Sequence, residues 1–249
     1  MYFDILLYLK SYFNGLNVEI RSKKCFNKPM KFLLTSGGLT NQSIAKALFD
    51  LVGKPTQETT IAFVPTAANV EEGDKGWLIA DLANIQKQHF MCIDIVDISA
   101  LSKELWLPRL ETADILFFSG GNTFHLMHWL KKSGLAEILP DLLKTRVYVG
   151  ISAGSMVTMK SLESSTSKQL YYEDVQGKMH DKGLGFFDFH FYPHLNSPHF
   201  PKVTKGILEE VAKDYKEPLY ALDDQSALKI VDSEIQVISE GKYLKLESK

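Results

Sequence analysis

YVGISAGSMV, residues Tyr148–Val157, is the stretch of this 249-residue chain that decides its fold. An apolar run ends at Gly150, Ser152 comes two residues later, and Gly154 follows the serine after another two. Glycine and serine favour tight turns for purely local reasons. The same spacing suits a nucleophile elbow, in which small neighbours allow a strained strand-to-helix turn to present one side chain to a site. Both interpretations are open until the rest of the chain is considered.

Strands and helices are expected to alternate on the N-terminal side of this stretch. Apolar runs predict strands within residues 31–38, 59–68, 92–99, 113–121 and 146–150, and apolar residues at helical spacing predict helices within 41–53, 71–90, 122–135 and 138–145. Because the strands are continuous apolar runs, we predict an α/β fold with a mostly parallel sheet covered by helices on both faces, in three layers. Functional groups on such sheets gather at the carboxyl ends of the strands.

The second half of the chain is less regular. Residues 161–183 are polar and contain glycine, so we expect an excursion with few apolar contacts that roofs a site. A strand edge within 187–196, a helix within 201–215 and short strands within 218–224, 226–231, 235–239 and 242–246 follow. We find no repeat and no convincing linker, so residues 30–249 are predicted to form one domain.

The composition is that of an ordinary soluble globular protein. Hydrophobic residues make up 45% and charged residues 23% of the chain, and the formal net charge is −2, so neither a nucleic acid nor a membrane surface is expected as a partner. Two cysteines far apart, Cys25 and Cys92, argue against a disulfide framework or a zinc knuckle. We expect a cytoplasmic protein without a cofactor, and leave a homodimer open.

Residues 1–29 are interpreted as an N-terminal extension. Met1–Phe13 is apolar and aromatic, but Lys10 interrupts it and its uncharged part is too short to span a bilayer. Asp4 is the first charge and no small-residue cleavage site stands out, so a signal peptide is not expected. A helix docked on the surface, a peripheral membrane helix and an artefact of start-site choice remain as interpretations.

Three predicted strand ends share a sequence rich in serine and glycine: Ser36–Gly38, Ser119–Asn122 and Gly150–Gly154. Backbone amides from the Gly120–Asn122 turn and from Ala153 could converge on one oxygen anion, which is how an oxyanion hole is built. The chain has no G-x-G-x-x-G and no G-K-[ST] sequence, so a nucleotide site is not expected.

A serine nucleophile needs a base, and the chain has seven histidines. His190, His194 and His199 cluster in FHFYPHLNSPHF, where three imidazoles also offer an alternative metal site. Pro193 rules out a helical face that would present them together, and no acidic ligand is closely interleaved. His194 stands where an apolar alternating run gives way to a loop, which suits a base aimed into a strand-end site. A surface or core imidazole is the alternative for each histidine taken alone.

The base in turn needs an acid that orients it. Asp223 and Asp224 end the strand predicted within 218–224, and turn-forming aspartate is the alternative interpretation. The order Ser152, His194, Asp224 differs from the serine, acid, histidine order of the α/β-hydrolases. The same three roles would therefore be carried by a different fold.

Four motifs occur together in this order: GGNTFHL, GISAGS, YPHLN and ALDDQSAL. With them, the chain from Met30 to Leu246 resembles the S51 peptidases, the family of dipeptidase E and of cyanophycinase. The resemblance implies a class I glutamine-amidotransferase-like, flavodoxin-like α/β fold in which a serine replaces the cysteine nucleophile. In this comparison Ser152 resembles the nucleophile, and His194 resembles the histidine of an N-P-H segment, although Tyr192 here precedes the proline.

The resemblance also suggests the remaining site residues. Gly121 and Ala153 match the amides of the oxyanion hole, and Asp224 stands where dipeptidase E has a glutamate. A further aspartate between the serine and the histidine is implicated in the family, and Asp174 is the candidate for it in a region that is longer here.

The predicted function is that of a serine-type exopeptidase or dipeptidase that hydrolyses short peptides through an acyl-enzyme, without a metal ion. A non-catalytic small-molecule binding module on the same fold is one alternative, and an esterase or amidase with the same triad is another. A fold does not by itself decide between them.

Overall fold

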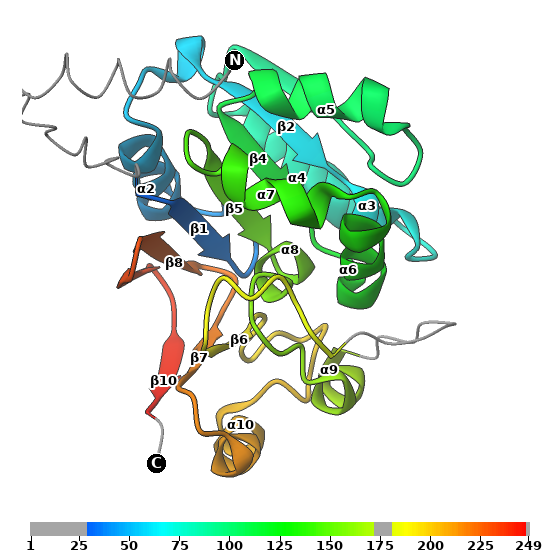
Figure 1. Cartoon of the computed structure of the whole chain (residues 1–249). Coiled ribbons are helices and arrows are strands. Elements are labelled where there is room, and N and C mark those ends of the chain that lie inside the picture. The colour runs from blue at the N-terminus through cyan, green and yellow to red at the C-terminus, as the bar shows by residue number, and fades with distance from the viewer. Residues whose placement is uncertain (1–28, 172–180, 248–249) are drawn as a thin grey trace, which may run out of the picture.

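The structure, a computed structural model, describes residues 29–171 and 181–247 (Figure 1). Its main sheet has seven strands in the order β3-β2-β4-β5-β1-β8-β9. The first five strands of that order are parallel, and β8 and β9 are antiparallel to their neighbours. The strands are β1 (Lys31–Thr35), β2 (Thr60–Val64), β3 (Cys92–Ile95), β4 (Ile115–Phe118), β5 (Val147–Ile151), β8 (Ser226–Val231) and β9 (Glu234–Ser239). The mostly parallel sheet predicted from the sequence is confirmed, and β5 lies at its centre.

Helices cover both faces of this sheet because side chains alternate along its buried strands. Leu116 and Phe118 of β4 point to the face covered by α5 (Lys103–Thr112), α6 (Thr123–Lys132) and α7 (Leu135–Leu142). Ile115 and Phe117 point to the other face, against α2 (Gln42–Val52) and α4 (Gly76–Gln86). Continuous apolar strands therefore fill two cores, one on each side, as expected of a doubly covered parallel sheet.

A second, smaller sheet was not predicted. It has the order β10-β7-β6, with β6 (His190–Tyr192), β7 (Leu219–Leu222) and β10 (Tyr243–Leu246). Figure 1 shows it beyond the end of the main sheet at which β1 ends. The chain passes from β7 of the small sheet to β8 of the main sheet through residues 223–225. Two sheets are thus joined by the turn that contains Asp224.

The remaining helices are short: α3 (Thr66–Asn69), α8 (Ala153–Met156), α9 (Ser164–Tyr171) and α10 (Lys205–Val211), with 3₁₀ turns at Thr56–Glu58 and Ala212–Asp214. In the described part of the chain, none of the helices has the length and apolar character needed to cross a membrane.

The polar excursion predicted at 161–183 is partly wrong. Its first part contains α9, and Leu162, Leu170 and Tyr171 are buried in the main core. Three large side chains were enough to anchor this otherwise polar segment, because each is buried in the main core. Residues 172–180, with Asp174, lie outside the described residues.

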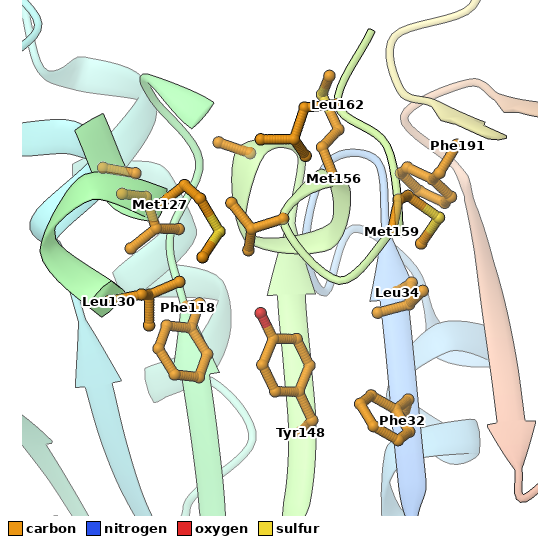
Figure 2. Packing of buried hydrophobic residues seen from close by; sticks show 14 of the residues in the cluster. Phe32, Leu34, Phe118, Met127, Leu130, Tyr148, Met156, Met159, Leu162 and Phe191 are labelled. Carbon is orange, nitrogen blue, oxygen red and sulfur yellow. The ribbon is translucent and has the colours of Figure 1, made fainter. Parts of the chain in front are cut away.

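The core beneath the centre of the sheet supports the end of β5. Phe118 and Tyr148 stack with ring centroids 4.8 Å apart, and Figure 2 shows the Tyr148 hydroxyl pointing along β5 toward the helix that follows it. That hydroxyl donates a hydrogen bond of 2.5 Å to the carbonyl oxygen of Gly154. Burial raises the pKa of Tyr148 well above its ordinary value, so the phenol stays protonated and remains a donor.

Candidate active site

Ser152 occupies a strained turn between β5 and α8. Its backbone angles are φ 47° and ψ −107°, and a positive φ is uncommon for a residue with a side chain. Its neighbours are small by necessity. A Cβ on Gly150 would lie 2.5 Å from backbone atoms of Gly154 and Ser155, and one on Gly154 would lie 2.4 Å from the carbonyl oxygen of Phe118. The strained strand-to-helix turn predicted from the sequence is present.

Three side chains form one chain of hydrogen bonds at this turn. His194 Nε2 lies 2.9 Å from Ser152 Oγ, and His194 Nδ1 lies 2.6 Å from Asp224 Oδ1. His194 follows β6 of the small sheet, and Asp224 lies in the turn between β7 and β8. The structure therefore brings together the serine, histidine and aspartate singled out in the sequence.

The surroundings of Asp224 keep its carboxylate ionised. Burial alone would raise its pKa, but hydrogen bonds from His194 and Ser36 and the charge of His194 outweigh burial and lower the pKa. An ionised carboxylate accepts the Nδ1 proton of the imidazole, which leaves Nε2 free to accept a proton from Ser152.

Aromatic side chains hold the His194 ring in place. Phe200 stacks on it with ring centroids 4.6 Å apart and planes 20° from parallel. Tyr171, at the end of α9, contacts Phe200 edge-on and donates a hydrogen bond of 3.0 Å to the carbonyl oxygen of Pro193. The ring is thus fixed through its stacking face and through the backbone that carries it.

Two backbone amides close to Ser152 in the chain or in space have no hydrogen-bond partner among the described residues. The turn after β4 passes close to the serine, since a Cβ on Gly120 would lie 3.5 Å from Ser152 Cβ. Within the described residues, the amides of Gly121 and Ala153 donate no hydrogen bond. Gly121 has φ 123°, and Asn122 begins α6 by accepting the amide hydrogen of His125 at 3.0 Å. The geometry suits an oxyanion hole built from the two amides named in the sequence analysis.

Comparison with known proteins shows the family of the chain. The model of peptidase family S51 matches residues 32–238. The chain belongs to peptidase family S51. It is therefore a hydrolase of the peptidase class, as the resemblance of its four motifs implied.

Individual relatives are similar to this S51 peptidase over part of their length. An uncharacterized peptidase of Listeria innocua is 28% identical over 180 residues, which are 72% of this chain and 84% of the relative. A peptidase E of Shewanella oneidensis is 42% identical over 129 residues, which are 49% of this chain and 52% of the relative.

Solved structures share its fold. A Listeria monocytogenes protein provisionally assigned as a peptidase E has a TM-score of 0.69 at 24% identity, over 86% of this chain and 100% of that one. A peptidase from an acI-B1 Actinobacterium has a TM-score of 0.65 at 16% identity, over 89% and 96%. The flavodoxin-like α/β class expected for an S51 peptidase is confirmed.

The other two clustered histidines make no hydrogen bond to Ser152 within the described residues. His190 is buried and stacks on Tyr215 with ring centroids 3.6 Å apart, and its Nε2 lies 3.6 Å from a carboxylate oxygen of Glu217. His199 is exposed. Among the described residues of this S51 peptidase, no three His, Cys, Asp or Glu side chains are grouped so that they could hold a metal ion.

Two polar residues near the site had no role in the sequence analysis. Ser36 follows β1 and contacts both His194 and Asp224. Asp81 lies on α4, with Oδ1 3.4 Å from where a Cβ on Gly38 would stand. The sequence analysis named Ser36 as part of a strand end but gave it no function. The sequence around Asp81 gives no signal of the groups that surround it, because they come from other elements.

Asp81 makes the stability of the protein depend on pH. Burial first, and then repulsion from Asp224, raise its pKa from 3.8 to about 7. Ionisation is easier in the unfolded chain, so stability is greatest below the unfolded pKa and decreases as pH rises through the folded pKa. Relative to the wild type at the same pH, Asp81→Asn should therefore be more stable by a margin that is roughly 2 kcal/mol larger near pH 8 than near pH 5.

Urea denaturation at the two pH values measures this difference. Asp74→Asn is the matched control, because it removes an exposed carboxylate just before the same helix. An Asp81→Asn protein with the same pH dependence as wild type would contradict the prediction.

Proposed function

We propose that this S51 peptidase is a serine-type exopeptidase or dipeptidase that cleaves short peptides with Ser152, His194 and Asp224 as its triad. The observation that carries the proposal is the continuous hydrogen-bond chain from Ser152 Oγ through His194 to Asp224 at a strained turn. A turn with a positive φ at a non-glycine residue has a cost, and such strain collects at functional sites.

In the proposed first half-reaction, Ser152 Oγ attacks the carbonyl carbon of the scissile peptide bond. His194 Nε2 takes the hydroxyl proton as the new C–O bond forms, and Asp224 stabilises the resulting imidazolium through Nδ1. The amides of Gly121 and Ala153 donate to the oxygen that becomes negatively charged. His194 then gives its proton to the leaving amine, and the C–N bond breaks to leave an acyl-enzyme.

The second half-reaction repeats these steps with water. His194 removes a proton from the water as its oxygen attacks the acyl carbon, and returns that proton to Ser152 Oγ as the ester bond breaks. The products are a carboxylic acid, which loses its proton to the solvent, and the free serine, so no other reactant is required. Asp174 remains a proposed additional acid for this cycle.

The aromatic side chains next to the His194 ring support a restriction to short substrates. Tyr171 and Phe200 come from different segments, and both lie against the His194 ring. Access to His194 is therefore narrowed on the side where these two rings meet. The names of relatives include peptidase E.

Peptides of increasing length test this restriction. We expect efficient hydrolysis of peptides of two or three residues and a steep fall in kcat/KM for longer ones, because a narrow site admits only a few residues. Replacing Phe200 by Ala should weaken the length dependence while lowering the overall rate, since it also removes the ring that stacks on His194. Equal kcat/KM for short peptides and for unfolded proteins would contradict the proposed exopeptidase activity.

Labelling with a fluorophosphonate separates the other candidate functions. A non-catalytic binding module would leave Ser152 unlabelled, whereas a serine hydrolase carries the label on the peptide that contains Ser152, which mass spectrometry identifies. An enzyme that is labelled and cleaves esters or simple amides but no peptide would be an esterase or amidase instead.

A further inference from the structure

Ser36 is a buried serine beside the proposed triad, at the first of the three strand ends that share a Ser/Gly-rich sequence. It follows β1 directly, and its side chain has no exposed surface. Its Oγ accepts the backbone N–H of His194 at 2.8 Å and donates to Asp224 Oδ1 at 2.7 Å. One hydroxyl therefore joins the residue that bears the base to the residue that bears the acid.

The direction of these two hydrogen bonds follows from the chemistry of the groups. A backbone N–H can only donate, so Ser36 Oγ must be its acceptor. An ionised carboxylate can only accept, so the Ser36 hydrogen must point to Asp224. The same Oδ1 also accepts from His194 Nδ1 at 2.6 Å. The result is a closed ring of hydrogen bonds through His194, Ser36 and Asp224.

The end of β1 is built to bring Ser36 this close. A Cβ on Gly37 would lie 2.9 Å from Asp224 Cβ and 3.0 Å from its carbonyl oxygen, so only glycine permits the approach. Thr40 Oγ1 donates to the carbonyl oxygen of Asp224 at 2.6 Å, which fixes the same turn from its other side. Ser36 is thus carried by a rigid strand end of the main sheet.

His194 itself depends on outside support. Its φ is 64°, a left-handed conformation that is unfavourable for histidine, and it lies just after the short strand β6. The hydrogen bond from its amide to Ser36 ties this strained residue of the small sheet to the main sheet. Without that bond the imidazole would keep its stacking on Phe200, but the amide of His194 would lose its partner and the segment one of its links to the main sheet.

We propose that Ser36 is a positioning residue for the reaction, which aligns His194 with Asp224 and supplies a second donor to the ionised carboxylate. The inference rests on the proposed triad. It assigns a function to the Ser36–Gly38 strand end, which lies beside Ser152 but supplies none of its reacting groups.

Replacing Ser36 by Ala tests the proposal, with fluorophosphonate labelling of Ser152 followed across a range of pH. We expect the labelling rate near pH 8 to fall about 10- to 100-fold, because one buried charged hydrogen bond and one backbone anchor are lost. The acidic limb of the profile should move to higher pH, because without the Ser36 donor the Asp224 carboxylate makes the His194–Asp224 pair hold its proton more tightly. With a peptide substrate, kcat should fall while KM changes little.

Thr40→Val is the matched control. It also removes a hydrogen bond between the end of β1 and the turn of Asp224, but touches neither the carboxylate nor the base. We expect a smaller loss of rate and an unmoved acidic limb. Ser36→Cys keeps a side chain of similar shape, slightly larger and with a weaker donor, so it gives a second test of the shift of the limb where Ser36→Ala folds poorly.

A nuclear magnetic resonance signal gives a readout that does not depend on hydrolysis. The proton in the bond between His194 Nδ1 and Asp224 should shift in Ser36→Ala and stay in place in Thr40→Val. Absence of labelling in the wild type would overturn the triad, while this signal would still report on Ser36. The proposal would be overturned if Ser36→Cys and Ser36→Ala both kept the labelling rate, the pH profile and the proton signal of the wild type. Effects of equal size in Ser36→Ala and Thr40→Val would overturn it as well.

Discussion

Replacing Ser152 by Ala is expected to lower peptide hydrolysis by about 10⁴-fold or more and to abolish fluorophosphonate labelling. Alanine has no oxygen to attack the carbonyl carbon, and the remaining amides and bound substrate supply only part of the rate. The fold should be retained, because within the described residues the side chain hydrogen-bonds to His194 alone, and alanine meets the same backbone strain as serine.

Ser155→Ala is the control on the same short helix. Ser155 is buried and donates to the carbonyl oxygen of Thr35 at 2.9 Å, away from the base. The Ser155→Ala substitution should lower the free energy of unfolding by about 1 kcal/mol and leave most of the activity. The two variants are compared by thermal denaturation and by turnover of one short peptide. Unchanged turnover in Ser152→Ala would contradict the proposed mechanism.

Replacing Gly121 by Ala is expected to damage stability and activity together. A Cβ there would lie 2.3 Å from the carbonyl oxygen of Ala67, and φ is 123°, where residues with side chains are strained. The clash is with backbone, so the turn itself must move and carry the Gly121 amide away from the nucleophile. We expect a loss of about 3 kcal/mol or more in free energy of unfolding and a fall in kcat of about 10²-fold or more.

Gly206→Ala provides the matched comparison. Gly206 lies in α10, and a Cβ there meets no atom within 4 Å. This substitution should be neutral or stabilise by about 0.5–1 kcal/mol, since alanine favours a helix. Urea denaturation measures both, and a Gly121→Ala protein as stable as wild type would show that the turn can relax.

The parts of the site that the sequence could predict are those with local signals. An apolar run before Gly150 and small residues around Ser152 led to a strand, a tight turn and a nucleophile, and the turn is where it was expected. His194 and Asp224 were found because each ends an apolar run, and the structure brings both to the serine.

The parts that could not be predicted depend on contacts between distant segments. The small sheet is built from β6, β7 and β10, and nothing in three short apolar runs shows that they leave the main sheet. The helix α5 contains Pro108 and buries only Trp106 and Leu110, so it has no clear amphipathic pattern. Asp81 could not be singled out, because its burial and its repulsion from Asp224 depend on segments that are distant in the sequence.

The division of the site between two sheets has a consequence for how the protein is made. Ser152 ends the central strand of the main sheet, whereas His194 follows β6 and Asp224 follows β7 of the small sheet. On the ribosome, the serine is synthesised 42 residues before its hydrogen-bond partner, and the acid comes later still. A growing chain can fold β5 and its turn while the serine has no base. With the proposed triad, hydrolytic activity would arise only when the last quarter of the polypeptide has emerged and docked. The active peptidase would then form only at the end of its own folding.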